Sequence, residues 1–135
     1  MQVKLAFAIL GIVGCAAPPP TAPFHSVLRG EVAQTPTVAV LGRVDTTGVN
    51  FYSLFDVAAS VAGTDCIALL LTDRDRRRAK LLDGKQVRVR GKMMFQADLD
   101  QILPSQSGEI DGRKWSGTRC TGETVLYVTK IERIR

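Results

Sequence analysis

Short runs of hydrophobic and β-branched residues, separated by turn-forming residues, dominate the chain after its first quarter. Residues 37–44, 51–55 and 66–72 have the length and composition of strands. The last run is almost continuously apolar, as in a strand buried on both faces. Turn clusters at 45–48 and 63–65 separate the runs. We therefore expect three strands in this part of the chain.

Residues 73–82 predict one short helix. Asp73 can cap its N-terminus, where a negative charge is also favourable. The middle of the segment is strongly basic, and the spacing of Ala79 and Leu82 turns both toward the core. Asp83-Gly84 then ends the helix.

Residues 85–95 alternate with a period of two, which is typical of a half-buried antiparallel strand. Its apolar face carries Val87, Val89 and Met93, and its polar face carries Arg88, Arg90 and Lys92. Gly91 indicates a bulge or a sharp bend within this strand. We expect an irregular, Gly-rich excursion over 96–123 and a last strand over 125–134.

The N-terminus differs from the rest of the chain. Lys4 is followed by an apolar run from Leu5 to Val13 and then by small residues, which is the layout of a secretory signal. A membrane-spanning helix needs about 20 apolar residues, so this run is too short. Three consecutive prolines follow at 18–20, and proline cannot continue a helix.

Ile12-Val13-Gly14-Cys15 resembles the lipobox of bacterial lipoproteins. The resemblance implies that residues 1–14 are a signal peptide, cut off before Cys15, and that Cys15 carries acyl chains such as palmitate. Ala16 stands where an Asp commonly retains such proteins in the inner membrane. The resemblance therefore implies a cell-envelope protein, held in the outer membrane and facing the periplasm if the bacterium is Gram-negative. The alternative is an ordinary secretory signal with an incidental cysteine.

Residues 15–35 are expected to be the lipidated cysteine and a Pro-rich flexible tether, because proline-rich segments are extended. Residues 36–135 have the length of a single domain. The only histidine, His25, lies in the tether, where we interpret it as a solvated residue rather than a metal ligand or a base.

Cys66 and Cys120 remain once Cys15 is assigned to the anchor. An even pair of cysteines in an oxidising compartment predicts a disulfide. Two free thiols are the alternative, although the chain has no Cys-x-x-Cys motif.

The expected order is three strands, a short helix, a fourth strand, a long loop and a fifth strand, which is the order of the OB-fold. Residues 81–92 (LLDGKQVRVRGK) resemble the sequence motif that is common where the helix of an OB-fold meets its fourth strand. Residues 125–132 resemble the last strand of such a fold. The resemblance implies an all-β fold, a small five-stranded OB-like barrel with one short helix. Another small barrel or a β-sandwich is the alternative.

The sequence predicts no catalytic site, metal site or cofactor. The domain lacks a histidine beyond the tether and has no Gly-x-Ser-x-Gly motif, so an activated nucleophile is not expected. The carboxylates at 73 and 75, and those at 98, 100, 109 and 111, lack the spacing of an EF-hand. We interpret them as solvated turn residues.

The chain is mildly basic, with 18 Lys and Arg against 13 Asp and Glu and a net charge of +5. A candidate binding face combines the helix residues Arg74, Arg76, Arg77, Arg78 and Lys80 with the strand residues Arg88, Arg90 and Lys92. Trp115, in a Gly-rich loop, is either an exposed member of this face or a plug at the end of the barrel. The alternative for the basic residues is a solvated surface without a ligand.

Three functions remain open. The first is a membrane-anchored, non-enzymatic module that binds a protein, anionic lipid or polysaccharide of the envelope; nucleic acid is not expected there. The second is an enzyme with a carboxylate site in the 96–123 loop, and the third is a small structural subunit of an envelope assembly.

Overall fold

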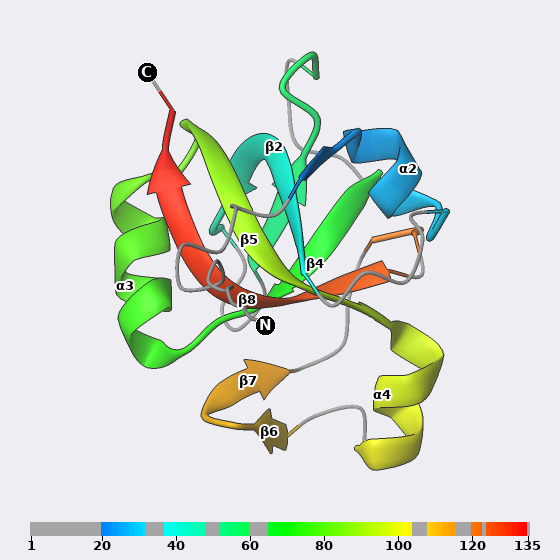
Figure 1. Ribbon diagram of the computed structural model, residues 1–135. Coiled ribbons are helices and arrows are strands. Elements are labelled where there is room, and N and C mark those ends of the chain that lie inside the picture. The colour runs from blue at the N-terminus through cyan, green and yellow to red at the C-terminus, as the bar shows by residue number, and fades with distance from the viewer. Residues whose placement is uncertain are drawn as a thin grey trace, which may run out of the picture.

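Five strands close into a barrel in the computed structural model of this protein, which describes residues 20–31, 37–47, 52–59, 65–103, 108–115, 120–122 and 124–134 (Figure 1). The barrel strands are β2 (Val38–Asp45), β3 (Tyr52–Phe55), β4 (Cys66–Leu70), β5 (Gln86–Phe95) and β8 (Thr124–Arg133). They pair in the order β2-β3-β4-β8-β5, and β5 pairs again with β2 to complete the barrel. The β4–β8 pairing is parallel and the other four are antiparallel. The predicted OB-like barrel is confirmed.

The barrel interior is filled by aliphatic side chains that alternate along the strands. In β5, Val87 and Val89 are fully buried while Arg88 and Arg90 lie outside, as the period of two predicts. Other members of this core include Val38, Val40, Leu54, Ile67, Leu71 and Leu126. Each such side chain contributes about 1.5–3 kcal/mol when it is taken out of water.

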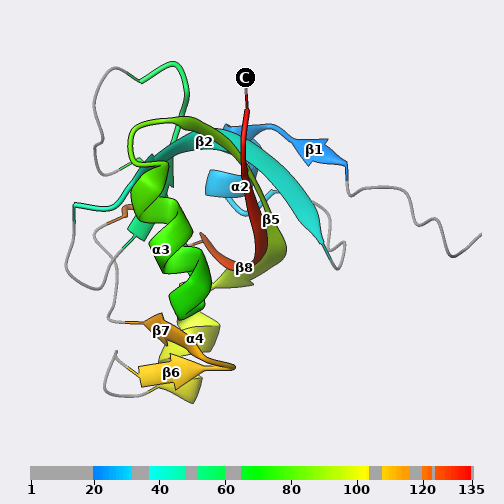
Figure 2. The same cartoon turned by 90° about the vertical axis from the view of Figure 1, so that its left-hand side faces the viewer.

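Strand β5 bends at Gly91, where its pairing with β8 shifts register between Arg90 and Gly91. Figure 2 shows β5 and β8 following one shared curve around the barrel. The backbone of β8 comes so close at Tyr127 and Val128 that a side chain at position 91 has no room. The predicted bulge is confirmed.

Helix α3 (Asp73–Leu81) connects β4 to β5. Its N-cap is Thr72, whose side-chain oxygen accepts a hydrogen bond from the backbone N–H of Asp75 at 3.2 Å. The expectation that Asp73 caps the helix is therefore wrong by one residue, and Asp73 instead places its charge in the first turn. Ala79 and Leu82 are buried, as predicted.

The expected flexible tether over residues 15–35 is wrong for residues 20–31. Here β1 (Thr21–Ala22) pairs in parallel with β2, and α2 (Phe24–Leu28) buries Phe24 and Val27 in the barrel core. The physical reason is that the first half of β2 has an open edge, because β3 pairs with β2 only from Arg43 onward. Strand β1 pairs with part of this open edge. The lipobox and Cys15 lie outside the described residues.

The excursion after β5 is also more regular than expected. It contains α4 (Gln96–Ile102) and a hairpin of β6 (Gly108–Ile110) and β7 (Arg113–Trp115). Figures 1 and 2 show these elements below the barrel, and they bury a second apolar cluster against β3, β4 and β8. That cluster contains Phe55, Ala68, Leu70, Leu99, Trp115 and Val125.

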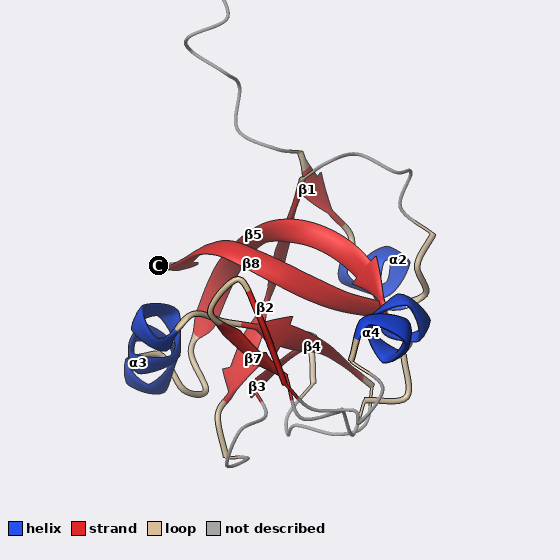
Figure 3. Ribbon diagram, turned by 90° about the horizontal axis from the view of Figure 1, so that it is seen from below, coloured by secondary structure: helices blue, strands red, loops and turns tan. Residues whose placement is uncertain are grey.

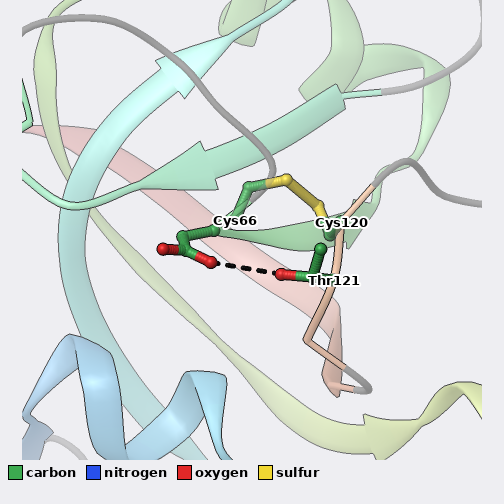
Figure 4. The surroundings of a disulfide bond; sticks show 4 residues. Cys66, Cys120 and Thr121 are labelled. Carbon is green, nitrogen blue, oxygen red and sulfur yellow. Dashed lines mark hydrogen bonds between the residues drawn. A yellow bond between two sulfur atoms is a disulfide. The ribbon is translucent and has the colours of Figure 1, made fainter.

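The disulfide between Cys66 and Cys120 is confirmed (Figure 4). It joins the start of β4 to the segment before β8, and its two Cα atoms are 5.0 Å apart. Beside it, the hydroxyl of Thr121 donates a hydrogen bond to Oδ1 of Asp65 at 3.1 Å. The bridge thus holds the end of the excursion against the barrel.

Replacing Gly91 with alanine should lower the free energy of unfolding by about 3 kcal/mol, because the new Cβ collides with the backbone of Tyr127 and Val128. Urea unfolding measures the change. The control is Gly84→Ala, where the new Cβ meets nothing within 4 Å. Its loss of stability should be about 1 kcal/mol, because alanine is only strained by the φ of +75° at this position. An equal loss in both variants would contradict the close packing at Gly91.

Replacing Cys66 and Cys120 together with alanine should destabilise the protein by up to about 4 kcal/mol, since the bridge closes a loop with a sequence separation of 54 residues. Urea unfolding with and without reductant checks this. Reductant should destabilise the natural chain and leave the double variant unchanged. A natural chain that is insensitive to reductant would show that the bridge is absent.

Candidate functional site

The face of an OB-fold that commonly binds ligands, on its second and third strands, is covered in this protein. All residues of β3 and β4 are buried. The outward side chains of Phe55, Ala68 and Leu70 pack in the second cluster with Leu99 of α4 and Trp115 of β7. A ligand therefore has no access to this face, and a binding site must lie elsewhere.

Trp115 is part of that cover. Its side chain is only 3 % exposed. Its indole Nε1 is buried and has no hydrogen-bond partner among the described residues. The interpretation of Trp115 as an exposed member of the binding face is wrong. Trp115 is buried on the outer face of β3 and β4, in the second cluster, and is not a plug in the barrel core.

The strand half of the candidate basic face is partly neutralised. Glu132 on β8 lies 3.9 Å from Arg88 and 3.4 Å from Arg90, and its other oxygen lies 3.8 Å from Lys130. Surface ion pairs of this kind contribute about 0–1 kcal/mol to stability. They do reduce the net positive charge that Arg88 and Arg90 present to a ligand.

The remaining candidates are spread over the surface. The guanidinium carbon of Arg76 lies 4.5 Å from the ring centroid of Tyr52, a cation–π contact. Arg77 and Lys92 are exposed. Arg74 and Arg78 of the predicted face line a surface hollow between α3, β7 and β8. The other predicted residues do not line it: Arg76, Arg77, Lys80, Arg88, Arg90, Lys92 and Trp115.

A hollow of about 690 Å³ lies between the first two turns of α3, β7 and the second half of β8. We call it the basic hollow. It is lined by Thr72, Arg74, Asp75, Arg78, Arg113, Thr129, Lys130 and Ile131. Four of these residues are cationic and one is acidic, so the hollow carries an excess of positive charge.

Two of the four cations are held in place by backbone carbonyls. Nε of Arg78 donates a hydrogen bond to the carbonyl of Ile131 at 2.9 Å. Nε and Nη2 of Arg113 donate to the carbonyl of Val128 at 3.1 and 2.9 Å. Because these acceptors are uncharged, the contacts orient the guanidinium groups without cancelling their charge.

Tyr127 supports Arg113 from the side. The guanidinium carbon of Arg113 lies 3.9 Å from the ring centroid of Tyr127. The phenol donates a hydrogen bond to Oδ2 of Asp111 at 2.6 Å and accepts one from Nη1 of Arg113 at 2.9 Å. The bond to Asp111, with some burial, raises the pKa of Tyr127 above its ordinary value, and Arg113 opposes this rise.

Arg113 and Lys130 are the two cations of the hollow that the sequence analysis missed. Arg113 follows Asp111-Gly112, whose φ angles are 51° and 77°, as a tight hairpin turn requires. An Asp-Gly pair is a known hairpin signal. This signal could have predicted that Arg113 begins a strand. It could not have predicted that the strand places Arg113 beside α3.

The carboxylates do not form a cation site in the part of the chain that the structure describes. No group of three or more His, Cys, Asp or Glu side chains there could hold a metal ion. His25 contacts Asp56, with Nε2 2.8 Å from Oδ2, so it is exposed but not simply solvated. Among the described helices, none is long and apolar enough to span a bilayer.

Comparisons with known proteins add little. No model of a protein family matches this chain, and no curated protein matches it. A solved structure that does match is a protein from Leishmania major Friedlin described as an aspartyl-tRNA synthetase, with 18 % identity and a TM-score of 0.43. The match covers 84 % of this chain and 20 % of that one. The chain thus spans about a fifth of that protein, and no function follows from the likeness.

Replacing Asp111 with asparagine should lower the pKa of Tyr127, because the phenol loses the anion that stabilises its neutral form. A titration followed by tyrosinate absorbance measures this, and Tyr127→Phe identifies the signal. The pKa of Tyr127 is higher in the folded protein than in the unfolded chain. Tyr127 therefore contributes fully to the free energy of unfolding at pH values below its unfolded-state pKa, and this contribution is lost as the pH rises through its folded-state pKa. An unchanged titration in Asp111→Asn would contradict the hydrogen bond.

Proposed function

We propose that this protein is a membrane-anchored, non-enzymatic envelope lipoprotein whose OB-like module binds an anionic envelope component through the basic hollow. The proposal of binding rests on one observation. Three elements of the fold place four cationic side chains around one hollow: Arg74, Arg78, Arg113 and Lys130. The signal segment and the lipobox resemblance at Cys15 carry the anchoring part.

The disulfide supports export. Disulfides persist in oxidising compartments such as the periplasm and are rare in the cytosol. The Cys66–Cys120 bridge joins the start of β4 to the segment before β8, and such a bridge needs an environment in which it persists. An envelope location satisfies that need.

The docked N-terminal segment sets the distance of the module from its anchor. Pro20 is the fifth residue after Cys15, and from there the chain lies against the barrel. A chain of that length reaches at most ~18 Å. A module anchored at Cys15 would therefore stay close to the bilayer, with the side formed by β1 and α2 nearest to it.

Intact mass of the protein from its native membrane fraction, before and after reduction, tests the anchor. We expect a mass that starts at Cys15, carries added acyl chains and increases by two hydrogens on reduction. A full-length, unmodified protein in the soluble fraction would overturn the proposal of a lipoprotein.

Co-sedimentation of the detergent-solubilised chain with the insoluble envelope fraction tests the binding. We expect binding that weakens as salt is added, because the attraction is between exposed charges. Binding that is absent, or that is unaffected by salt, would overturn the proposed anionic partner.

A further inference from the structure

We infer that the basic hollow binds a phosphate group carried by a ligand outside the protein's own bilayer, such as a phosphorylated saccharide. The inference deepens the proposed function and rests on it. It names the chemical group that the hollow recognises and the direction from which the ligand arrives.

The charges of the hollow suit a doubly charged anion. Arg74, Arg78 and Arg113 form no ion pair with a carboxylate among the described residues, and Lys130 has a single contact of 3.8 Å with Glu132. Asp75 is the one acidic lining residue. A carboxylate ligand carries one negative charge and would neutralise one of these cations. A phosphate group carries up to two, and its oxygens can bind several of these cations at once.

The form of the cations also favours phosphate. Three of the four are arginines, whose planar guanidinium groups bind phosphate oxygens through paired hydrogen bonds. Arg78 uses only Nε for the carbonyl of Ile131, so its terminal nitrogens are not bonded to any other described residue. Arg113 donates hydrogen bonds to the carbonyls of Val128 and Asp111 and to the phenol of Tyr127, so it is ordered before a ligand binds. It offers a ligand its charge and one remaining N–H rather than a paired hydrogen bond.

The hollow is larger than one phosphate. Its volume of about 690 Å³ lies in the range of about 300–1,000 Å³ that small-ligand sites occupy. Asp75 and Thr72 provide a carboxylate and a hydroxyl beside the cations, and both are groups that bind sugar hydroxyls. A phosphorylated saccharide unit therefore fits the lining better than an isolated phosphate ion.

The hollow lies away from the side of the barrel on which the N-terminal segment docks. Figures 1 and 3 both show α3, which forms one wall of the hollow, on the side of the barrel opposite α2. An anchor at Cys15 that holds β1 and α2 toward the bilayer therefore turns Arg74 and Lys130 away from the headgroups of that bilayer.

Calorimetric titration of the full chain in neutral detergent with glucose 6-phosphate tests the site, with glucuronate as a carboxylate probe. The test variant is Arg74→Ala/Lys130→Ala, since neither side chain holds the fold. Its matched control, Arg77→Ala/Lys92→Ala, removes the same charge from exposed residues outside the hollow. We expect at least about a tenfold loss in the first variant and less than about twofold in the second.

Three outcomes would overturn the site: no binding of glucose 6-phosphate to the natural chain, equal losses in both variants, or glucuronate binding as tightly. The direction is tested by reconstituting the chain through its own anchor in phosphatidylcholine vesicles with and without phosphatidylglycerol. Glucose 6-phosphate should bind equally in both. Weaker binding in the anionic vesicles would show that the hollow takes headgroups of its own bilayer.

Failure of this inference can be told apart from failure of the proposed function. If Arg74→Ala/Lys130→Ala still co-sediments with the envelope fraction in a salt-dependent way, an anionic partner remains but the basic hollow is not its site. If the natural chain does not co-sediment at all, the proposed function itself is wrong.

Discussion

The structure depends on the double pairing of β5. Its first half bonds to β2 on one side, and nearly its whole length bonds to β8 on the other, so this one strand closes the barrel. A strand can serve two partners in different directions only if it bends, and the bulge at Gly91 provides the bend. The close approach of β8 at Tyr127 requires that this residue be a glycine.

Closure by β5 leaves two surfaces that other segments must cover. The free edge of β2 is covered by β1 and α2, and the apolar outer face of β3 and β4 is covered by α4 and the β6–β7 hairpin. Because α4 and the β6–β7 hairpin pack on it, the face that usually binds ligands in this fold is buried as a second apolar core. The disulfide at Cys120 and the contacts of Arg113 hold this cover in place.

The same cover creates the candidate site. Because the hairpin lies against β8, Arg113 comes to the first turns of α3 and completes a basic hollow. A module whose common binding face is filled therefore presents a different surface, on the side away from its N-terminal segment.

Local patterns in the sequence predicted the strands, and the resemblance of their order to the OB-fold predicted the barrel. The period of two in residues 85–95, the apolar run after Cys66 and the glycine at 91 each act between neighbouring residues, and each was predicted correctly. The disulfide was also predicted, because only two cysteines remained to pair. The signal segment and the lipobox resemblance at Cys15 are likewise local patterns, and they stay predictions.

The sequence placed two of the four cations of the site, Arg74 and Arg78, in its candidate face, and the tertiary structure decided their partners. The sequence groups these helix residues with Arg88 and Arg90, yet Glu132 neutralises part of that strand group. The hollow instead joins the helix arginines with Arg113 and Lys130, which are far from them in the sequence. Which charges converge depends on how the hairpin, α3 and β8 pack, and packing between distant segments leaves no periodic signal in the sequence.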